Sequence, residues 1–258
     1  MGLAKRIIPT LLFRGDALVK GLGYNSWRSV GHVVQAAKIY GSRGVDEIML
    51  LDIGATPERR GPDLKIVEKV ATDFFTPLTV GGGVRGIADV RDLLNAGADK
   101  VSICTAAMDD PEMLGECSVR FGRQAIVAAV DVRNDQVVSH CGTQGKVFWE
   151  RDRLQARPVR AVEWAKALEE NGAGEIVLSA VERDGALVGY DLDLIARVAA
   201  AVDVPVVASG GCKGYDDMHE AFKAGASAAA AGALFQFTDC TPKGAAKYLA
   251  ALGVETRI

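Results

Sequence analysis

The segment TVGGGVRG, residues 79–86, is the clearest indication of how this chain folds. A short apolar run ends in three glycines, and a helical pattern begins directly after them. Glycine reaches positive φ without strain and lets backbone N–H groups approach a ligand closely. At a corner between a strand and a helix, such groups and the helix dipole form a site for phosphate. The segment therefore predicts a phosphate-binding corner around Gly82 and Gly83.

A similar segment, VASGGCKG, occupies residues 207–214, and Gly211 lies 211 − 83 = 128 residues after Gly83. The same offset relates two further pairs of segments: GAD at 97–99 to GAS at 225–227, and GVDEI at 44–48 to GAGEI at 172–176. The repeat predicts two copies of a half-fold, each with its own glycine-rich corner. We therefore expect a ligand with two phosphates, or with a phosphate at each end.

Composition describes an ordinary water-soluble protein, with 258 residues, 49% hydrophobic residues and a formal net charge of −3. The absence of a basic excess argues against nucleic acid or an anionic membrane surface as a partner. The N-terminus has no apolar signal region, so we expect a cytoplasmic location. Five scattered cysteines without a C-x-x-C spacing, and three distant histidines, indicate reduced thiols. We expect neither a metal nor a cofactor.

Apolar runs of strand length alternate eight times with helical patterns, which is the pattern of a (β/α)8 TIM barrel. Continuous rather than alternating apolar character indicates parallel strands that are buried on both faces. The predicted strands are 7–12, 47–53, 78–80, 100–103, 125–132, 175–180, 205–208 and 228–231. The predicted helices are 33–40, 63–74, 87–96, 111–120, 159–170, 192–201, 216–224 and 242–252.

The whole chain, 1–258, is predicted to be a single domain whose half-barrels run roughly over 1–123 and 124–258. A doubly wound sheet would also accommodate the alternation, but the internal repeat favours a closed barrel. Two connections are long, 13–32 and 133–158. Long loops in compact domains are often lids or partner surfaces. The first contains Lys20 and a glycine-rich segment that looks flexible.

Catalytic groups of a (β/α)8 barrel lie at the carboxyl ends of its strands. Here those ends carry Leu12, Asp52, Gly82, Gly83, Cys104, Thr105, Asp131, Ser179, Asp184, Gly185, Ser209, Gly210, Gly211, Gly232 and Ala233. Thr105 and Ser209 can add hydroxyl groups to the two phosphate sites. The mouth of the barrel is therefore predicted to combine glycine corners with three carboxylates.

Asp131 is the strongest candidate for acid–base chemistry, because it ends the longest apolar strand and partial burial tunes its pKa. A helix cap or a salt bridge is the alternative for this carboxylate. Asp52 has a similar position, and hydrogen bonding to a neighbouring loop is an equally good explanation for it. For Asp184, a turn residue is slightly favoured over direct chemistry.

Four charged residues open strands at the other end of the barrel: Arg6, Glu47, Lys100 and Glu175. If the barrel closes, two cations and two anions ring its amino-terminal end. Solvated rim charges are the usual fate of such residues, and spacing alone favours that interpretation.

Together these motifs closely resemble the cyclase subunit of imidazole glycerol phosphate synthase, a (β/α)8 lyase that uses ammonia in histidine biosynthesis. The resemblance covers nearly the whole chain and rests on LAKRIIP at 3–9, LLDI at 50–53, TVGGG at 79–83, ADKVSI at 98–103, GAGEI at 172–176, RDG at 183–185 and ASGG at 208–211.

The resemblance implies that the two glycine corners bind the two phosphates of a ribulosyl substrate. It also implies that the four charged residues form a gate for ammonia from a glutaminase subunit docked at the amino-terminal face. Asp99 and Gln124 match positions of that partner face, and Lys20 and Asp131 match catalytic positions. With the resemblance, the gate is favoured over solvated rim charges.

Three positions depart from the family pattern. Leu12 stands where the family has a catalytic aspartate, Cys104 replaces an asparagine, and Ala233 replaces the usual serine of the second phosphate corner. An alkyl side chain neither accepts nor donates a proton, and loss of an acid–base residue typically costs about 10² to 10⁴ in rate. The resemblance therefore indicates chemistry that differs from that of the histidine-pathway cyclase.

A leucine at this position is similar to a branch of the family found in surface-polysaccharide pathways, as are LVK at 18–20 and VRAVEWAK at 159–166. That branch supplies ammonia to convert an acylamino group of a sugar into an amidine, which implies a third, ATP-using partner that activates the acceptor. Two alternatives remain open. One is an authentic cyclase in which Asp52 or Asp184 replaces the lost carboxylate, and the other is a non-catalytic scaffold that docks a glutaminase.

Overall fold

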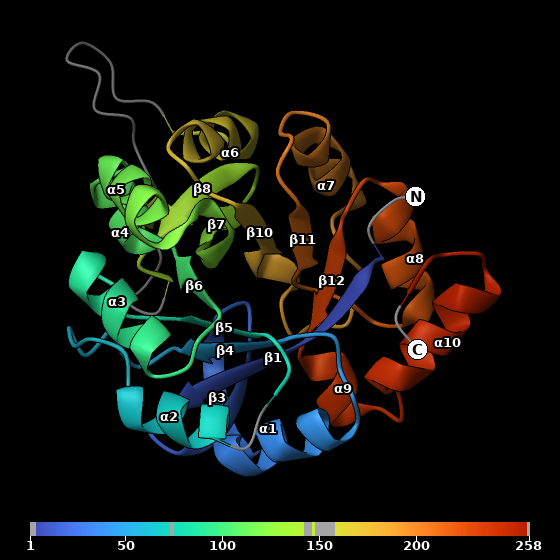
Figure 1. The fold of residues 1–258 in the computed structure, drawn as a ribbon. Coiled ribbons are helices and arrows are strands. Elements are labelled where there is room, and N and C mark those ends of the chain that lie inside the picture. The colour runs from blue at the N-terminus through green and yellow to red at the C-terminus, as the bar shows by residue number, and fades with distance from the viewer. Residues whose placement is uncertain (1–3, 73–74, 142–145, 148–157, 257–258) are drawn as a thin grey trace.

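Eight parallel strands pair side by side and close into a barrel in the computed structural model, which describes residues 4–72, 75–141, 146–147 and 158–256 (Figure 1). The wall consists of β1 (Arg6–Arg14), β4 (Ile48–Asp52), β5 (Leu78–Gly81), β6 (Lys100–Ile103), β7 (Ile126–Arg133), β10 (Glu175–Ala180), β11 (Val206–Ser209) and β12 (Ala228–Ala231). Closure comes from the pairing of β7 with β10 and of β12 with β1. The predicted (β/α)8 barrel is confirmed, and the doubly wound alternative is wrong.

Helices surround the strands on the outside of the barrel (Figure 1). They are α1 (Val33–Ser42), α2 (Leu64–Thr72), α3 (Ile87–Asn95), α5 (Glu112–Phe121), α6 (Ala161–Glu170), α7 (Leu192–Ala199), α8 (Tyr215–Lys223) and α10 (Pro242–Ala251). All of them were predicted to within two residues, except that the end of the second predicted helix, 73–74, lies outside the described residues. No helix in these parts of the chain is both long and apolar enough to cross a membrane.

Two helix starts show the local chemistry behind these elements. The Asp191 side chain accepts a hydrogen bond from the Leu194 N–H and so caps α7. The Thr241 hydroxyl caps α10 in the same way, and Pro242 follows at the first helical position, where its missing N–H leaves no bond unmade. The shorter helices α4 (Thr105–Asp109) and α9 (Ala233–Phe237) were not predicted, because five residues are too few to show a helical period.

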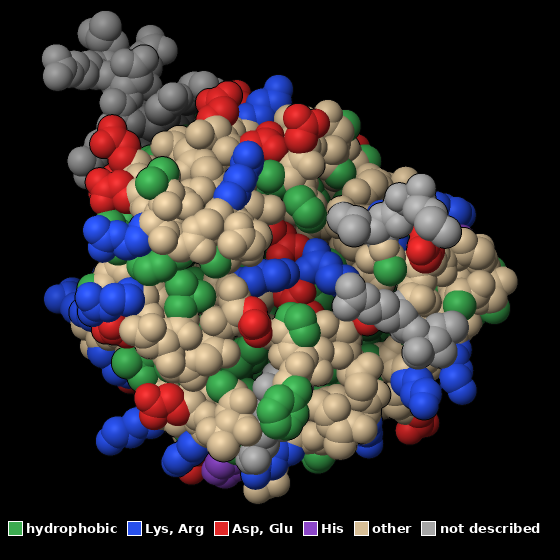
Figure 2. Space-filling model, viewed as in Figure 1, with side chains coloured by type: hydrophobic (Ala, Val, Ile, Leu, Met, Phe, Trp, Pro, Cys, Tyr) green, Lys and Arg blue, Asp and Glu red, His purple; other side chains and the backbone are tan. Residues whose placement is uncertain are grey.

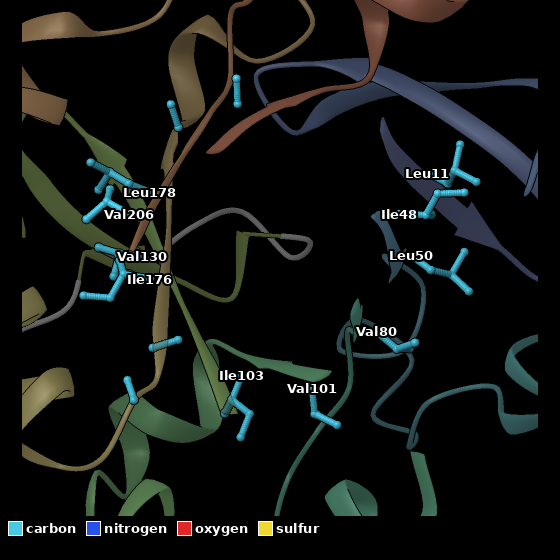
Figure 3. Packing of buried hydrophobic residues seen from close by; sticks show 14 of the residues in the cluster. Leu11, Ile48, Leu50, Val80, Val101, Ile103, Val130, Ile176, Leu178 and Val206 are labelled. Atoms are coloured by element: carbon cyan, nitrogen blue, oxygen red, sulfur yellow. The ribbon is translucent and has the colours of Figure 1, made fainter. Parts of the chain in front are cut away.

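Two separate apolar clusters hold the barrel together. The larger lies between the strands and the helices, and Figure 3 labels Leu11, Ile48, Leu50, Val80, Val101, Ile103, Val130, Ile176, Leu178 and Val206 from it. The smaller fills the inside of the barrel with Ile8, Met49, Val127, Val177, Val207, Ala228 and Ala230. Alternate residues of a strand point to opposite faces, and six of the eight strands, β1, β4, β7, β10, β11 and β12, contribute to both clusters. This double burial explains the continuous apolar runs in the sequence.

The first long connection is not the flexible loop that the sequence suggested. Residues 13–32 extend β1 and form an antiparallel hairpin of β2 (Ala17–Leu22) and β3 (Asn25–His32). β3 is largely exposed and polar. It forms because it pairs with β2 and not because it buries an apolar face, so the sequence has no apolar pattern from which to predict it. In the second connection, β8 (Gln136–Ser139) pairs with β7 and with β9 (Lys146–Val147). Most of the remainder lies outside the described residues.

Candidate functional site

A pocket opens at the carboxyl ends of the barrel strands. The sequence-predicted residues that line it are Leu12, Lys20, Asp52, Gly82, Gly83, Cys104, Thr105, Asp131, Ser179, Asp184, Gly185, Ser209, Gly210, Gly211, Gly232 and Ala233. Its floor includes Met49 and Val177 of the interior cluster. Residues that lie far apart in the sequence meet here because parallel strands bring all their carboxyl ends to one side of the barrel.

The two glycine corners have matching backbone geometry. Gly82 and Gly83 have φ of 96° and 72°, and Gly210 and Gly211 have φ of 86° and 102°. A Cβ atom on Gly82 would lie 2.2 Å from the Asp52 carbonyl oxygen, and one on Gly210 would lie 2.6 Å from the Ala180 carbonyl oxygen. Both corners therefore require glycine for conformation and for space, and both turn backbone toward the pocket.

Asp131 lies at the end of β7 with a hydroxyl and two thiols as its partners among the described residues. Its Oδ1 accepts a hydrogen bond of 3.0 Å from the Tyr24 hydroxyl, and its Oδ2 lies 3.6 Å from the Cys104 sulfur. The Cys141 thiol also hydrogen-bonds the carboxylate. Burial raises the pKa of Asp131 to about 6, although these hydrogen bonds oppose the rise. A carboxyl group with such a pKa can both take up and release a proton near neutrality.

Lys20 was expected in a flexible loop but lies in β2, with its side chain directed into the barrel. The residue is only 4% exposed, and its Nζ donates a hydrogen bond of 2.9 Å to the Thr10 carbonyl oxygen. Burial lowers the pKa of Lys20 to about 8, while the charge of Asp184 opposes this effect. A Cβ atom on Gly232 would lie 2.4 Å from Nζ, so the amine is packed against the second glycine corner.

The Asp52 carboxylate forms hydrogen bonds with residues that follow it closely in the sequence. Its Oδ1 accepts hydrogen bonds from the backbone N–H groups of Gly54 and Ala55, each at 3.1 Å. The Arg60 guanidinium donates to both carboxylate oxygens, at 2.7 and 3.0 Å, and the Asp63 N–H donates to Oδ2. The side chain is fully buried. These contacts favour the alternative interpretation of Asp52 as the anchor of a neighbouring loop.

Leu12 makes one side of the pocket apolar. It is 8% exposed, and its backbone pairs with Val19 of β2 and with Leu51 of β4. Leu51 lines the pocket beside it. The position where the resemblance places a second catalytic carboxylate is therefore a hydrocarbon surface.

A second hollow adjoins the first glycine corner. It shares Gly83 and Thr105 with the main pocket, and its further lining includes Arg59, Arg60 and Arg85 together with Asp109 and Asp110. Arg60 is paired with Asp52 and Glu58, and Arg85 with Asp89, so most of the positive charge on this side of the mouth is already balanced.

Tyr24, Trp27 and Cys141 also line the pocket, and sequence reasoning missed all three. Tyr24 belongs to the glycine-rich segment that looked flexible. One signal could have identified it: an aromatic residue lies within a run of turn-forming residues, shortly after a lysine in an apolar segment. The hairpin geometry that directs it to Asp131 depends on contacts distant in sequence.

The four charged residues at the amino-terminal end form a closed ring of ion pairs. Arg6 bonds Glu47 at 2.6 Å and also bonds Glu175, and Lys100 bonds Glu47 at 3.0 Å and Glu175 at 2.8 Å. Glu47 accepts a further hydrogen bond of 2.6 Å from the Thr79 hydroxyl. Figure 2 shows basic and acidic side chains together over the middle of the barrel.

Burial separates this ring from ordinary rim charges. The Glu47 and Glu175 side chains are only 3% and 7% exposed, and those of Arg6 and Lys100 are 20% exposed. Burial by itself raises the pKa of Glu175, but the hydrogen bond and charge of Arg6, together with Lys100, hold it below its ordinary value. Solvated rim charges, which spacing alone favoured, are therefore the wrong description.

Asp99 and Gln124 lie at the same end of the barrel, just before β6 and β7, and both are exposed. Asp99 accepts a hydrogen bond of 2.8 Å from the Leu78 N–H, which also stabilises the start of β5. Among the described residues, no three His, Cys, Asp or Glu side chains gather as a set of metal ligands.

Comparison with protein families gives one finding for this chain. The model of a family described as histidine biosynthesis protein matches residues 6–241. The match begins at the first residue of β1 and includes both glycine corners, the charged ring and every pocket residue named above.

Proposed function

The chain belongs to the histidine biosynthesis protein family, and from that premise we propose that it is an ammonia-using synthase subunit of the sugar-amidation type. Members of the family are enzymes of histidine biosynthesis, among them barrel cyclases and isomerases. The proposed subunit receives ammonia from a glutaminase and transfers it to an acceptor held at the mouth of the barrel.

The observation that carries the proposal is the division of the mouth into an apolar and an acidic side. Leu12 forms the apolar side, and Arg60 together with backbone N–H groups occupies Asp52. Asp184 also lines the pocket, but it interacts with the charge of Lys20 and with the Gly185 backbone, so Asp131 is the carboxylate best placed for proton transfer. One such group is sufficient when the acceptor carbon arrives already activated, whereas imidazole closure with cleavage of the substrate calls for two.

The chemical step balances with one carboxylate. The lone pair of ammonia forms a C–N bond to the activated carbon, and the activating oxygen group leaves with its bonding electron pair. Asp131 takes one proton from the new ammonium nitrogen and later releases it to solvent. A third, ATP-using protein supplies the activation before the acceptor reaches this subunit.

The interior of the barrel supports a short path for ammonia. Met49 and Val177 line the pocket floor, and each lies two residues beyond an acid of the ring, Glu47 and Glu175 respectively. Two residues of a strand span about 7 Å. Only one apolar layer therefore separates the ring from the pocket. A small neutral molecule suits such a layer, and transient opening of the ion pairs would admit it.

The two glycine corners support an acceptor with phosphate at one or both ends. The first corner has the Thr105 hydroxyl and the nearby guanidinium groups. The second has Ser209 and the amine of Lys20, but Ala233 lacks the hydroxyl that the resemblance leads one to expect. The glutaminase is proposed to dock at the opposite face, over the charged ring and the exposed Asp99 and Gln124.

The first test is whether the purified protein makes imidazole glycerol phosphate. It is supplied with an ammonium salt at high pH and with the ribulosyl bis-phosphate precursor of the histidine pathway. We expect no turnover by the unmodified chain and measurable turnover by Leu12→Asp, which restores a carboxylate. Leu12→Asn is the matched control, because it is polar and similar in size but cannot exchange the proton.

Turnover by the unmodified chain would contradict the proposal and identify an authentic cyclase. The scaffold alternative predicts a different pattern. In that case a partner glutaminase would still be activated by Asp131→Asn, and calorimetry would detect no binding of the bis-phosphate precursor at micromolar concentrations.

A further inference from the structure

Tyr24 lies in the turn between β2 and β3 and reaches the centre of the pocket mouth. Its hydroxyl donates the 3.0 Å hydrogen bond to Asp131 Oδ1 and also contacts Ser179 of β10. Burial and the charge of Asp131 raise the pKa of Tyr24 well above its ordinary value. The phenol therefore stays protonated and acts as a fixed donor to the carboxylate.

The backbone around Tyr24 is built to hold the ring in this place. Tyr24 has φ of 62°, a left-handed conformation that is unfavourable for a residue with a Cβ atom. The preceding Gly23 N–H donates a hydrogen bond of 2.9 Å to the Asp184 carbonyl oxygen. A Cβ atom on Gly185 would lie 2.1 Å from the Gly21 carbonyl oxygen, so the hairpin and the connection after β10 are in close contact.

The two oxygens of Asp131 have donors of unequal strength. Oδ1 has the phenol at 3.0 Å, whereas Oδ2 has the Cys104 thiol at 3.6 Å. A thiol is a weak hydrogen-bond donor. The other ionisable groups that face the carboxylate are Cys141, which follows β8, and Asp184, which follows β10 and has Lys20 of β2 beside it. Oδ1 thus has the stronger donor, the Tyr24 phenol, and Oδ2 has the weaker one, the Cys104 thiol.

We propose that Tyr24 is a positioning residue of the amidation site, which fixes Asp131 through Oδ1 and leaves Oδ2 as the oxygen that takes the proton from the attacking ammonia. The role of Oδ2 in the reaction rests on the proposed function, whereas the positioning of the carboxylate does not. Tyr24 compensates for Leu12 in one respect. It orients the Asp131 carboxylate without adding a further charge to the mouth.

Direct titration of Asp131 tests this assignment without any acceptor. The full chain is labelled with ¹³C at aspartate side-chain carboxyls, and Asp131→Asn identifies the Asp131 resonance. The titration midpoint is then measured in the unmodified protein, in Tyr24→Phe and in Cys104→Ala. Tyr40→Phe is the matched control, because the buried Tyr40 hydroxyl bonds a backbone oxygen of Phe235 away from the pocket.

A hydrogen bond to a charged group lowers a carboxyl midpoint, so Tyr24→Phe is expected to raise it by about one to two pH units. Cys104→Ala is expected to raise it by less, because the thiol is the weaker donor. Tyr40→Phe is expected to leave the midpoint unchanged. An unchanged midpoint in Tyr24→Phe, or a larger rise in Cys104→Ala, would overturn the assignment.

The positioning role of Tyr24 and the proposed amidation function can be contradicted independently of each other. A shifted midpoint in Tyr24→Phe supports the positioning role even if the protein proves to be an authentic cyclase in the ribulosyl assay. Thermal unfolding of each variant accompanies the titration, and Tyr24→Leu provides a second variant that removes the hydroxyl. It too is expected to raise the midpoint, and a rise confined to Tyr24→Phe would count against the hydroxyl as the cause.

Discussion

Two aspartates with the same position in their βα units have different environments. Asp52 ends an apolar run at β4 and Asp131 ends one at β7, but only Asp52 has an arginine and three backbone N–H donors around it. Asp131 has a phenol and thiols instead. A buried carboxylate with no cation bonded to it is costly to ionise, and a pKa raised in this way is characteristic of reactive sites.

Asp131→Asn is expected to stabilise the protein at pH 8 while abolishing ammonia-dependent product formation. Burial raises the pKa of Asp131 to about 6, above its value in the unfolded chain. The stability that this group contributes is therefore present at low pH and is lost as the pH rises through about 6. Removing the charge should raise the free energy of unfolding at pH 8 by about 1 to 2 kcal/mol, with the difference vanishing below pH 4.

Asp52→Asn is the matched control for that measurement. It removes the buried carboxylate partner of Arg60 and leaves only the more exposed Glu58, so urea unfolding at pH 8 should show a loss of stability. Destabilisation of Asp131→Asn to the same extent would contradict the assignment of different roles to the two aspartates.

At the scale of elements, the β2–β3 hairpin determines what the pocket contains. It supplies Lys20, Tyr24 and Trp27 to the pocket lining. Among the strands that the structure describes, β3 pairs with β2 alone, and a cation–π contact, with the Arg28 guanidinium 4.8 Å from the Phe237 ring centre, joins the hairpin to α9. The hairpin is thus attached to the barrel at its base and at a few points along its length.

Gly185→Ala is expected to loosen this hairpin without unfolding the barrel. Gly185 has φ of 74°, and an added Cβ would collide with the Gly21 carbonyl oxygen. Trypsin should therefore cleave after the exposed Arg28 about tenfold faster or more, because local opening becomes easier.

The matched control is Gly86→Ala, at a glycine with extended backbone and no neighbour within 4 Å of an added Cβ. It should be cleaved at the rate of the unmodified chain. Equal cleavage of Gly185→Ala would show that the contact with Gly21 does not hold the hairpin.

At the scale of the whole molecule, the barrel separates charge, apolar packing and chemistry along its axis. The ring of Arg6, Glu47, Lys100 and Glu175 closes one end, the interior cluster fills the middle, and the pocket opens at the other end. Buried ion pairs contribute little net stability, but losing one partner leaves a charge uncompensated. The ring is therefore sensitive to substitution at any member.

Lys100→Met is expected to lower the free energy of unfolding by about 2 to 4 kcal/mol at pH 7. Arg6 and Lys100 hold the pKa of Glu175 below its ordinary value against the effect of burial, so the stability from Glu175 is present at neutral pH and is lost as the pH falls. Without Lys100 this loss should begin at a higher pH in acid-unfolding curves.

Lys65→Met, at an exposed lysine of α2, is the control and should leave the acid-unfolding curve unchanged. If the ring also gates ammonia, Lys100→Met should reduce glutamine-driven turnover more than turnover driven by an ammonium salt. Equal effects on both would leave the ring with a structural role only.

The barrel itself could be predicted because its causes are local. Apolar runs buried on both faces, helical periods between them and two glycine corners at one offset are written in consecutive residues, and each of the eight strands was found to within two residues. The part of the pocket lining that lies at the strand ends could be predicted for the same reason, since parallel strands carry their carboxyl ends to one side, whereas Tyr24, Trp27 and Cys141 were missed.

Pairing between distant segments depended on the tertiary structure alone. Asp131 and Asp52 look alike in sequence, but Asp131 is bonded by Tyr24 from a distant hairpin, whereas Asp52 is bonded by Arg60 from the connection that directly follows its own strand. The hairpin was invisible because β3 has no buried face, and the charged ring looked like rim charge because its burial depends on closure of the barrel. The periodicity of a sequence indicates which residues are buried, but the partner of a buried polar group depends on which segments the fold brings together.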